Sequence, residues 1–316
     1  MNAPRMNAPR LFAPLAQAPA SRFSPAAAGS REQHLLERAA HLPSPPGVVM
    51  ALLGALEDER SDADSMATLL GRDPALTARV LKVANSSYYA MAGRVGTVSE
   101  AMLILGLGTI RKLVIALGVA NRLAGPVAKH PGLDGFWRHG TLVAAGTAAL
   151  ARRTGCEEGS AFIGGLLHDI GKLALASAFP AEFSAGPAAG PAAGPTAARA
   201  LAEEAALFGR DHASLGGWLA GHWRFPEALG AALRDHHEEQ PAGGLAQLIW
   251  HADRLAHAMD DLQAHSPGPV EDGAPGTVLQ VAAEALVAIG SHDCAPDLIA
   301  EIERQSGATL LLLQPA

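Results

Sequence analysis

The sequence predicts an all-α protein, and three observations support this prediction. Of its 316 residues 49% are hydrophobic but only 4% are aromatic, so Ala, Gly and Leu fill most of the core. This composition favours closely packed helices over a sheet rich in β-branched and aromatic side chains. Apolar residues recur at helical spacing, and we find no convincing alternation of period two. The length allows one large domain or two ordinary ones.

The chain divides into three parts. Residues 1–30 are rich in Ala and Pro, which predicts a disordered leader without the continuous apolar core of a secretory signal. Residues 31–260 form the main domain, with the boundary between a helical N-terminal part and a helical bundle at residue 125. An Ala/Gly/Pro tract over residues 184–196 is predicted to be a flexible insertion, and residues 261–316 are predicted to form a linker with a short helical tail.

The helices of the N-terminal part are separated by glycine-containing breaks. In Gly71-Arg72-Asp73-Pro74, Gly closes one helix, Asp caps the next and Pro takes its first position. Ser99 with Glu100 opens another helix, which Gly106-Leu107-Gly108 ends before a long amphipathic helix over residues 110–123. Successive helix–break–helix units also occur in DNA-binding proteins, but in helical bundles such breaks are ordinary connections.

The remaining helices follow from apolar spacing and from caps such as Asp211 and Pro226. We expect them over residues 48–56, 66–70, 136–153, 160–178, 197–208, 212–222, 226–237, 245–259, 278–289 and 296–302, before an apolar end at Leu310–Leu313.

Charge, cysteine content and hydropathy exclude several classes of protein. The formal net charge is −7, which argues against a broad footprint for nucleic acid. Cys156 and Cys294 lie too far apart to suggest a disulfide framework or a zinc knuckle, so the cytoplasm is the expected compartment. No window of about 18 uninterrupted apolar residues occurs, which predicts no membrane span.

The most informative motif is His168-Asp169-Ile170-Gly171-Lys172, which follows an apolar stretch. A buried carboxylate beside an imidazole needs a compensating partner, and a metal ion is a common one. Consecutive helical residues point about 100° apart, so one ion can contact both side chains. Gly164 and Gly165, one turn earlier, leave room for another helix to bring its own ligand close.

Further candidate ligands lie at wide spacing, and each also has a plain structural interpretation. His212 begins a helix, where a histidine is often a cap or a surface residue. His236 and His237 continue an apolar helix face and could equally be a satisfied core pair. Asp253 lies at the edge of an apolar stripe and could form a salt bridge. Together with His139, these side chains predict a site for one or two divalent transition metal ions: iron, manganese, zinc or nickel.

With these residues in view, the chain resembles the HD superfamily, whose hallmark His, His-Asp and Asp is matched by His139, His168-Asp169 and Asp253. More specifically it resembles the HDOD (HD-related output domain) family of bacterial signalling proteins. The matching stretches include Leu42-Pro43-Ser44-Pro45-Pro46, residues 73–86, residues 101–113, Phe136-Trp137-Arg138-His139, residues 165–172, Phe208-Gly209-Arg210-Asp211-His212, residues 223–227 and His236-His237. The resemblance implies an N-terminal helical subdomain packed on a divergent HD-domain helical bundle.

The related HD-GYP family hydrolyses cyclic di-GMP at a two- or three-metal site. The resemblance implies counterparts of many of its ligands at seven positions: His139, His168, Asp169, His212, His236, His237 and Asp253. The chain departs from that family after His237, where no Gly-Tyr-Pro follows, and at Gly135, where no acidic residue stands four positions before His139.

Three functions follow as hypotheses. The first, which the HDOD resemblance favours, is a signal-transduction output module that acts through contacts with other signalling proteins rather than through catalysis. The second is a metal-dependent phosphohydrolase acting on a cyclic dinucleotide or nucleotide, with Lys172 neutralising charge on the phosphate. The third, a DNA-binding regulator, is disfavoured by the acidic net charge.

Overall fold

The computed structural model confirms the all-α fold. It describes residues 25–45, 49, 66, 70, 74–85, 95–127, 130, 133, 135–186, 195–238, 244–264 and 275–313, and within these ranges all regular structure is helical. The helices are α1 (Pro25–Ala40), α4 (Pro74–Ala84), α5 (Val98–Leu105), α6 (Leu107–Val127), α7 (Phe136–Thr154), α8 (Glu158–Leu167), α9 (Ile170–Ala178), α10 (Pro180–Ala185), α11 (Pro195–Phe208), α12 (His212–His222), α13 (Glu227–Asp235), α14 (Gly244–Ala264), α15 (Pro275–Ala288) and α16 (Ala295–Leu313).

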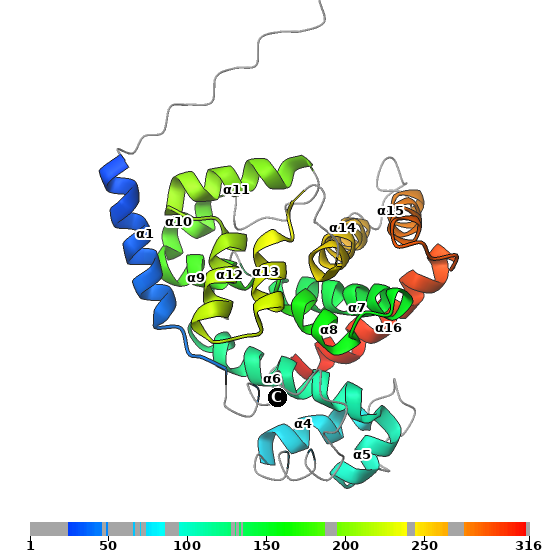
Figure 1. Cartoon of the computed structure of the whole chain (residues 1–316). Coiled ribbons are helices and arrows are strands. Elements are labelled where there is room, and N and C mark those ends of the chain that lie inside the picture. The colour runs from blue at the N-terminus through cyan, green and yellow to red at the C-terminus, as the bar shows by residue number, and fades with distance from the viewer. Residues whose placement is uncertain are drawn as a thin grey trace, which may run out of the picture.

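Helix α7 is the centre of the bundle. It packs against α8, α14 and α16, and every one of its residues from Gly140 to Ala151 is buried. Helices α4, α5 and α6 lie together beneath the bundle, whereas α1 runs along its left flank against α9, α11 and α12 (Figure 1). The first helix of the expected N-terminal subdomain therefore packs on the bundle rather than on α4 and α5.

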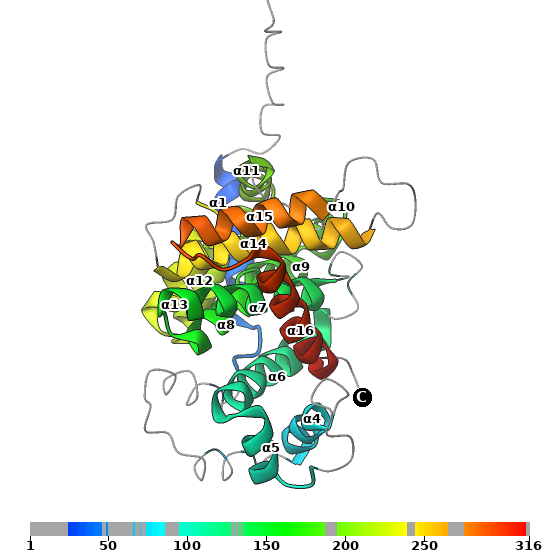
Figure 2. The same ribbon diagram turned by 90° about the vertical axis from the view of Figure 1, so that its right-hand side faces the viewer.

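The C-terminal helices form an additional layer. Helix α15 lies beside α14, and α16 runs from there across α7 to α6 and α4 (Figure 2). The expected short helix over 296–302 is wrong in length, because α16 continues without a break to Leu313. Its buried Ile302, Ser306 and Thr309 face the bundle, so tertiary packing sustains the helix past the expected end.

Several helix ends also differ from the sequence prediction. Helix α1 begins at Pro25, so residues 25–30 are helical although they fall within the expected leader. Helix α5 begins at the cap Thr97, whose side chain and that of Glu100 bond reciprocally to backbone, rather than at Ser99. The expected leader over 1–24, insertion over 187–194, helix over 50–56 and linker over 265–274 lie outside the described residues.

The segment predicted as a single helix over 160–178 is two helices. The chain leaves α8 at His168 and enters α9 at Ile170, with Asp169 between them at φ −94° and ψ 13°. At this break the Lys172 amide donates to the Asp169 carbonyl oxygen at 2.9 Å, a tighter turn than that of an α-helix. The His-Asp doublet therefore occupies a kink, which turns both side chains toward the bundle interior.

The run Glu158–Ala178 has the length and hydropathy of a membrane span, yet 89% of its most apolar window is buried inside the protein. Helices α5 and α6 would also meet that test as one span, but they are bent by 112° at their junction. The hydropathy of the first run is accounted for by its place in the core, where Ile163, Leu166 and Leu167 are among the most deeply buried side chains.

Candidate metal centre

Two glycines of α8 set the distance between the helices that carry the site. A Cβ atom at Gly165 would lie 2.7 Å from the Val143 carbonyl oxygen of α7. One at Gly164 would lie 3.1 Å from Ile249 of α14. Because these positions lack a Cβ, α7 and α14 approach α8 closely, as the sequence suggested. The approach brings the side chains of all three segments into one region.

The structure brings all seven predicted ligand residues together. They come from α7, the α8–α9 kink, the start of α12, the end of α13 and the middle of α14, and all are buried or half-buried. In this order they are His139, His168 and Asp169, His212, His236 and His237, and Asp253. Their imidazole and carboxylate groups form clusters whose ligand atoms lie within 4.8 Å of one another, a spacing that suits metal ions.

His168 and His236 are held in the same way. Each directly follows a helix, where backbone carbonyls lack an intrahelical partner. The Nδ1 of His168 bonds to the Gly165 carbonyl oxygen at 2.8 Å, and that of His236 to the Leu233 carbonyl oxygen at 2.8 Å. Both Nε2 atoms are buried without a hydrogen-bond partner. A neutral ring whose Nδ1–H donates presents a lone pair at Nε2, which is how histidine binds metals. His236 has this form, whereas at His168 burial is outweighed by carboxylates, which raise its pKa and hold a proton on its Nε2 when no metal is bound.

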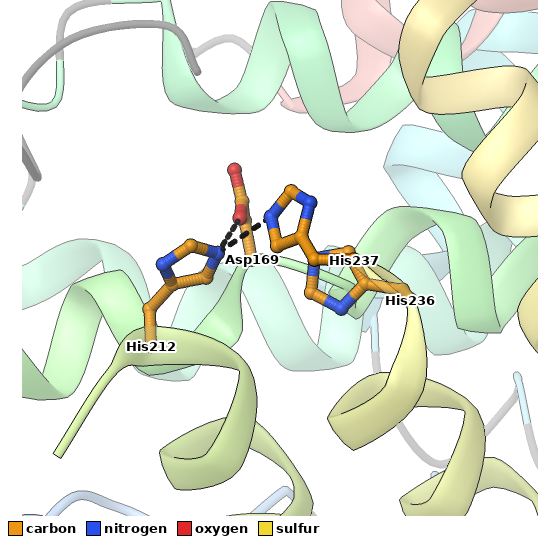
Figure 3. Close-up of side chains that lie close together, drawn as sticks. All are labelled: Asp169, His212, His236 and His237. Atoms are coloured by element: carbon orange, nitrogen blue, oxygen red, sulfur yellow. Dashed lines mark hydrogen bonds and ion pairs between the residues drawn. The ribbon is translucent and has the colours of Figure 1, made fainter. Parts of the chain in front are cut away.

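The first cluster consists of Asp169, His212, His236 and His237 (Figure 3). The Nε2 of His212 lies 3.1 Å from Asp169 Oδ1 and 3.0 Å from His237 Nε2. At the other side of the ring, Glu204 accepts from both the Nδ1 and the backbone amide of His212, at 2.7 and 2.8 Å. Glu204 therefore fixes the orientation of His212 and aims its Nε2 at the cluster.

The second cluster consists of His139, Asp253 and His257. The Oδ1 of Asp253 lies 3.0 Å from His139 Nε2 and 3.3 Å from His257 Nε2. The Nδ1 of His139 faces the Oδ2 of Asp260 at 3.1 Å, and Asp260 also pairs with Arg138. His168 Nε2 stands 3.6 Å from Asp253 Oδ1, so it lies between the two clusters.

Sequence reasoning missed His257, Asp260 and Glu204. His257 and Asp260 stand four and seven residues after Asp253, a spacing that places all three on one helix face, so this signal was available. Glu204 stands eight residues before His212 on a different helix, and no spacing rule connects the two.

Protons alone do not satisfy the second cluster. Burial lowers the pKa of His139 to about 4, so its ring is neutral at pH 7 and carries a single N–H. That one hydrogen faces two carboxylates, Asp260 at Nδ1 and Asp253 at Nε2. Whichever nitrogen is protonated, the other presents a lone pair to a negative oxygen. A cation between His139 and Asp253 removes this conflict.

Several groups in the first cluster, and His168 beside it, have shifted pKa values. Burial acts to lower the pKa values of His168 and His212, but the charges of Asp169 and Glu204 outweigh it and raise them to about 10 and about 9. Burial lowers the pKa of His237 to about 3. Burial opposes ionisation of Asp169, yet the charges of Lys172 and His168 hold its pKa well below the usual range. Two protonated imidazoles thus balance the carboxylates when no metal is bound.

Lys172 belongs to the same region. Its Nζ donates to Asp169 Oδ2 at 2.7 Å, and the side chain is largely buried. Although burial acts to lower its pKa, the Asp169 charge raises it, so the ammonium stays charged. The lysine thus lies beside the carboxylate nearest the first cluster. Its expected contact with a phosphate remains a prediction.

The residues present fit divalent transition metal ions. Imidazole and carboxylate groups are ligands of zinc, iron, manganese and nickel. Buried atoms without a hydrogen-bond partner here include His236 Nε2, His168 Nε2 and Asp169 Oδ1. His168 Nε2 lies in ion-pair range of Asp169 and Asp253, and Asp169 Oδ1 in ion-pair range of His212. Each would gain a partner if an ion were bound.

The fold and the clusters define an all-helical protein with a buried His/Asp centre. A family model described as the HDOD domain matches residues 42–239, more than half of the chain. The chain therefore belongs to the HDOD domain family. Asp253, His257 and Asp260 lie beyond the matched residues, in α14.

Solved structures share the fold. A putative phosphohydrolase from Shewanella amazonensis SB2B is 27% identical, with a TM-score of 0.65 over 89% of this chain and 97% of its own. An HDOD domain protein of unknown function from Geobacter sulfurreducens is 22% identical, with a TM-score of 0.61 over 90% of this chain and 98% of its own.

A sequence relative, an uncharacterized protein of Treponema pallidum (strain Nichols), is 25% identical over 205 residues, which are 64% of this chain and 39% of that protein's length.

Proposed function

We propose that this chain is a bacterial signal-transduction output module built around a metal centre. It binds one or two divalent transition metal ions, works in the cytoplasm and acts through contacts with other signalling proteins. Membership of the HDOD domain family supports the signalling role. The converging histidines and carboxylates support the metal centre.

One observation carries the metal-binding part of this proposal. His236 Nε2 is buried in a region rich in carboxylates and has no hydrogen-bond partner. Leaving a buried polar atom unsatisfied costs about 1–3 kcal/mol. This atom lies within ligand range of Asp169, His212 and His237, and it gains a partner if an ion completes the cluster. Metal binding is therefore the function that the geometry supports best.

The test is the metal content of the purified chain. We expect bound metal by mass spectrometry, and its recovery after chelation and reloading with Fe²⁺, Mn²⁺, Zn²⁺ or Ni²⁺. His236→Ala should lower the affinity at least about tenfold because it removes a ligand. His222→Ala, an exposed histidine of α12, is the matched control and should change nothing. A wild-type chain that takes up none of the four ions would contradict the proposal.

A second candidate function is a metal-dependent phosphohydrolase acting on a cyclic dinucleotide or nucleotide. The position of Lys172 favours it, because a buried ammonium beside Asp169 can neutralise a phosphate oxygen that enters the site. The 27% identity to the Shewanella protein named a phosphohydrolase is consistent with this candidate. Bound ions would supply a water of lowered pKa as the nucleophile. Glu204 would hold His212, and Asp260 would hold His139, in ligand geometry during the reaction.

Activity assays separate the two candidates. The metal-loaded chain is incubated with cyclic di-GMP and with generic phosphodiesters, in the presence of Mn²⁺ or Fe²⁺. Hydrolysis that falls at least about a hundredfold in Lys172→Ala, with metal content retained, would establish the phosphohydrolase. Lys112→Ala, which removes a lysine bound to Glu158 outside the centre, is the control. Full metal occupancy without turnover would favour the non-catalytic module.

A further inference from the structure

His257 lies on the same face of α14 as Asp253 and Asp260. The three residues follow one another at intervals of four and three positions, so their side chains line one stripe of the helix. Only 8% of His257 is exposed. Its ring lies 4.5 Å from that of His139, centroid to centroid, across the boundary between α14 and α7. The stripe therefore contributes Asp253 and His257 to the second cluster and places Asp260 beside His139.

A single oxygen atom of Asp253 is surrounded by imidazole nitrogens. Its Oδ1 has the Nε2 atoms of His139, His257 and His168 at 3.0, 3.3 and 3.6 Å. The His168 contact is longer than a hydrogen bond, and the neutral His139 ring has a single N–H that also faces Asp260. His139, His257 and Asp253 place their ligand atoms within 4.8 Å of one another, close enough to bind one ion.

The two clusters then have donors of the same kinds. Asp169 stands with His212, His236 and His237, one carboxylate and three imidazoles. Asp253 stands with His139 and His257, one carboxylate and two imidazoles. Without His257 the second set would keep only one imidazole of its own, because His168 lies 3.6 Å from Asp253 but 3.4 Å from Asp169. His257 makes the second position complete in its own right.

We propose that His257 is a metal ligand that completes, with His139 and Asp253, a second ion position beside the Asp169 cluster. The inference rests on the proposed function of metal binding and adds His257 as a ligand. Asp260 is a positioning residue, because it holds the Nδ1 of His139 and so directs Nε2 to the ion. The position takes a divalent transition metal that accepts nitrogen and oxygen ligands.

The test compares His257→Ala and His257→Gln with the wild-type chain. Metal content is measured by mass spectrometry, and the chain is also titrated with Co²⁺, whose visible absorption reports its ligands. We expect about two ions per wild-type chain and about one in either variant, with the affinity of the second position at least tenfold lower. His251→Ala removes another buried histidine of α14, one in edge-to-face contact with Trp250, and should retain both ions.

The glutamine variant distinguishes a ligand from a structural hydrogen-bond donor. Its amide can still donate to Asp253, so a structural role would be rescued, whereas loss of the ion in both variants supports coordination. Circular dichroism checks that each variant is folded, and Gln keeps the proposal testable if Ala unfolds. Two ions retained in folded His257→Gln would overturn the inference while metal binding stands. A wild-type chain without metal would overturn the proposed function as well, so the two failures are distinct.

Discussion

At the residue scale, Glu204 shows how a group that contacts no ion can control the centre. Its carboxylate, 1% exposed, accepts from the ring and from the backbone of His212. A carboxylate behind a histidine ligand fixes the tautomer and increases the basicity of the ring. We therefore expect Glu204 to act on metal affinity through His212.

We predict that Glu204→Gln lowers metal affinity by about 10–100-fold, the usual effect of removing such a partner. Isothermal titration with Zn²⁺ or Mn²⁺ measures the change. Glu203→Gln is the matched control, since Glu203 is exposed and pairs with Arg199 on the surface of α11. Equal affinities in the two variants would show that Glu204 has no role in orienting His212.

The shifted histidines predict how the stability of the metal-free chain depends on pH. Burial opposes protonation of His168 and His212, but neighbouring carboxylates raise their folded pKa values to about 10 and about 9. Their contribution is complete below the unfolded pKa of about 6.5 and is lost as pH rises through these values. Burial lowers the pKa values of His139 and His237 to about 4 and about 3, so stability also falls as pH drops below about 6.5.

The chelated protein should therefore resist thermal unfolding best near pH 6.5 and be less stable at both lower and higher pH. The alkaline decline should be smaller in Glu204→Gln, since Glu204 is the main group that raises the pKa of His212. Melting temperatures between pH 5 and pH 10 measure the profile. A melting temperature that does not decline between pH 7 and pH 10 would contradict the raised pKa values.

At the scale of helices, the close approach of α9 to α12 positions Asp169 near His212. Gly171 makes it possible, because a Cβ there would overlap the His212 carbonyl oxygen and lie 3.0 Å from the Gly216 amide nitrogen. Both neighbours are backbone atoms, which cannot move without shifting the helix. The glycine of the His-Asp-Ile-Gly-Lys motif is thus a packing requirement.

We predict that Gly171→Ala destabilises the fold by about 1–3 kcal/mol, as overpacking does, and weakens metal binding because Asp169 moves away from His212. Denaturant unfolding and metal titration measure the two effects. Gly221→Ala in α12 is the control: no atom lies within 4 Å of its added Cβ, so alanine should be neutral or slightly stabilising there. Wild-type stability in Gly171→Ala would refute this packing role.

The helices themselves could largely be predicted from the sequence. Asp211 caps α12 as expected, with its side chain accepting from the Ser214 amide at 2.8 Å. Gly106 breaks the chain between α5 and α6, at a φ of +78° that suits glycine. The kink at His168 was not predicted, since apolar residues keep helical spacing on both sides of the His-Asp doublet. In the structure the two halves pack on different partners, α8 on α7 and α9 on α12.

At the scale of the whole molecule, the sequence suggested that the candidate ligands lie together but could not establish it. Seven ligand candidates were identifiable by residue type and motif, yet their distances depend on the packing of segments more than a hundred positions apart. His257 had a local signal, four residues after Asp253, but needed the fold to show that this helix face turns inward. The role of these residues as ligands stays a prediction until metal is measured.

The C-terminal helices support the centre and the core together. Helix α14 carries Asp253 and His257, and α16 covers α7, where Arg152 and Arg153 pair with Glu301. We predict that removing residues 290–316 exposes the buried face of α7 and lowers the melting temperature, measured by calorimetry. Arg304→Ala, an exposed residue of α16, should leave the melting temperature unchanged. An unaltered melting temperature in the shortened chain would contradict this support.

The family match ends at residue 239, but the candidate metal centre continues into α14 with Asp253 and His257. A polypeptide cut at that point would lose one of the two central acids and uncover apolar side chains such as Val143 and Leu150. It would therefore be expected to aggregate and to bind at most one ion. Negative assays on such a fragment would therefore not bear on a polypeptide that extends through Leu313.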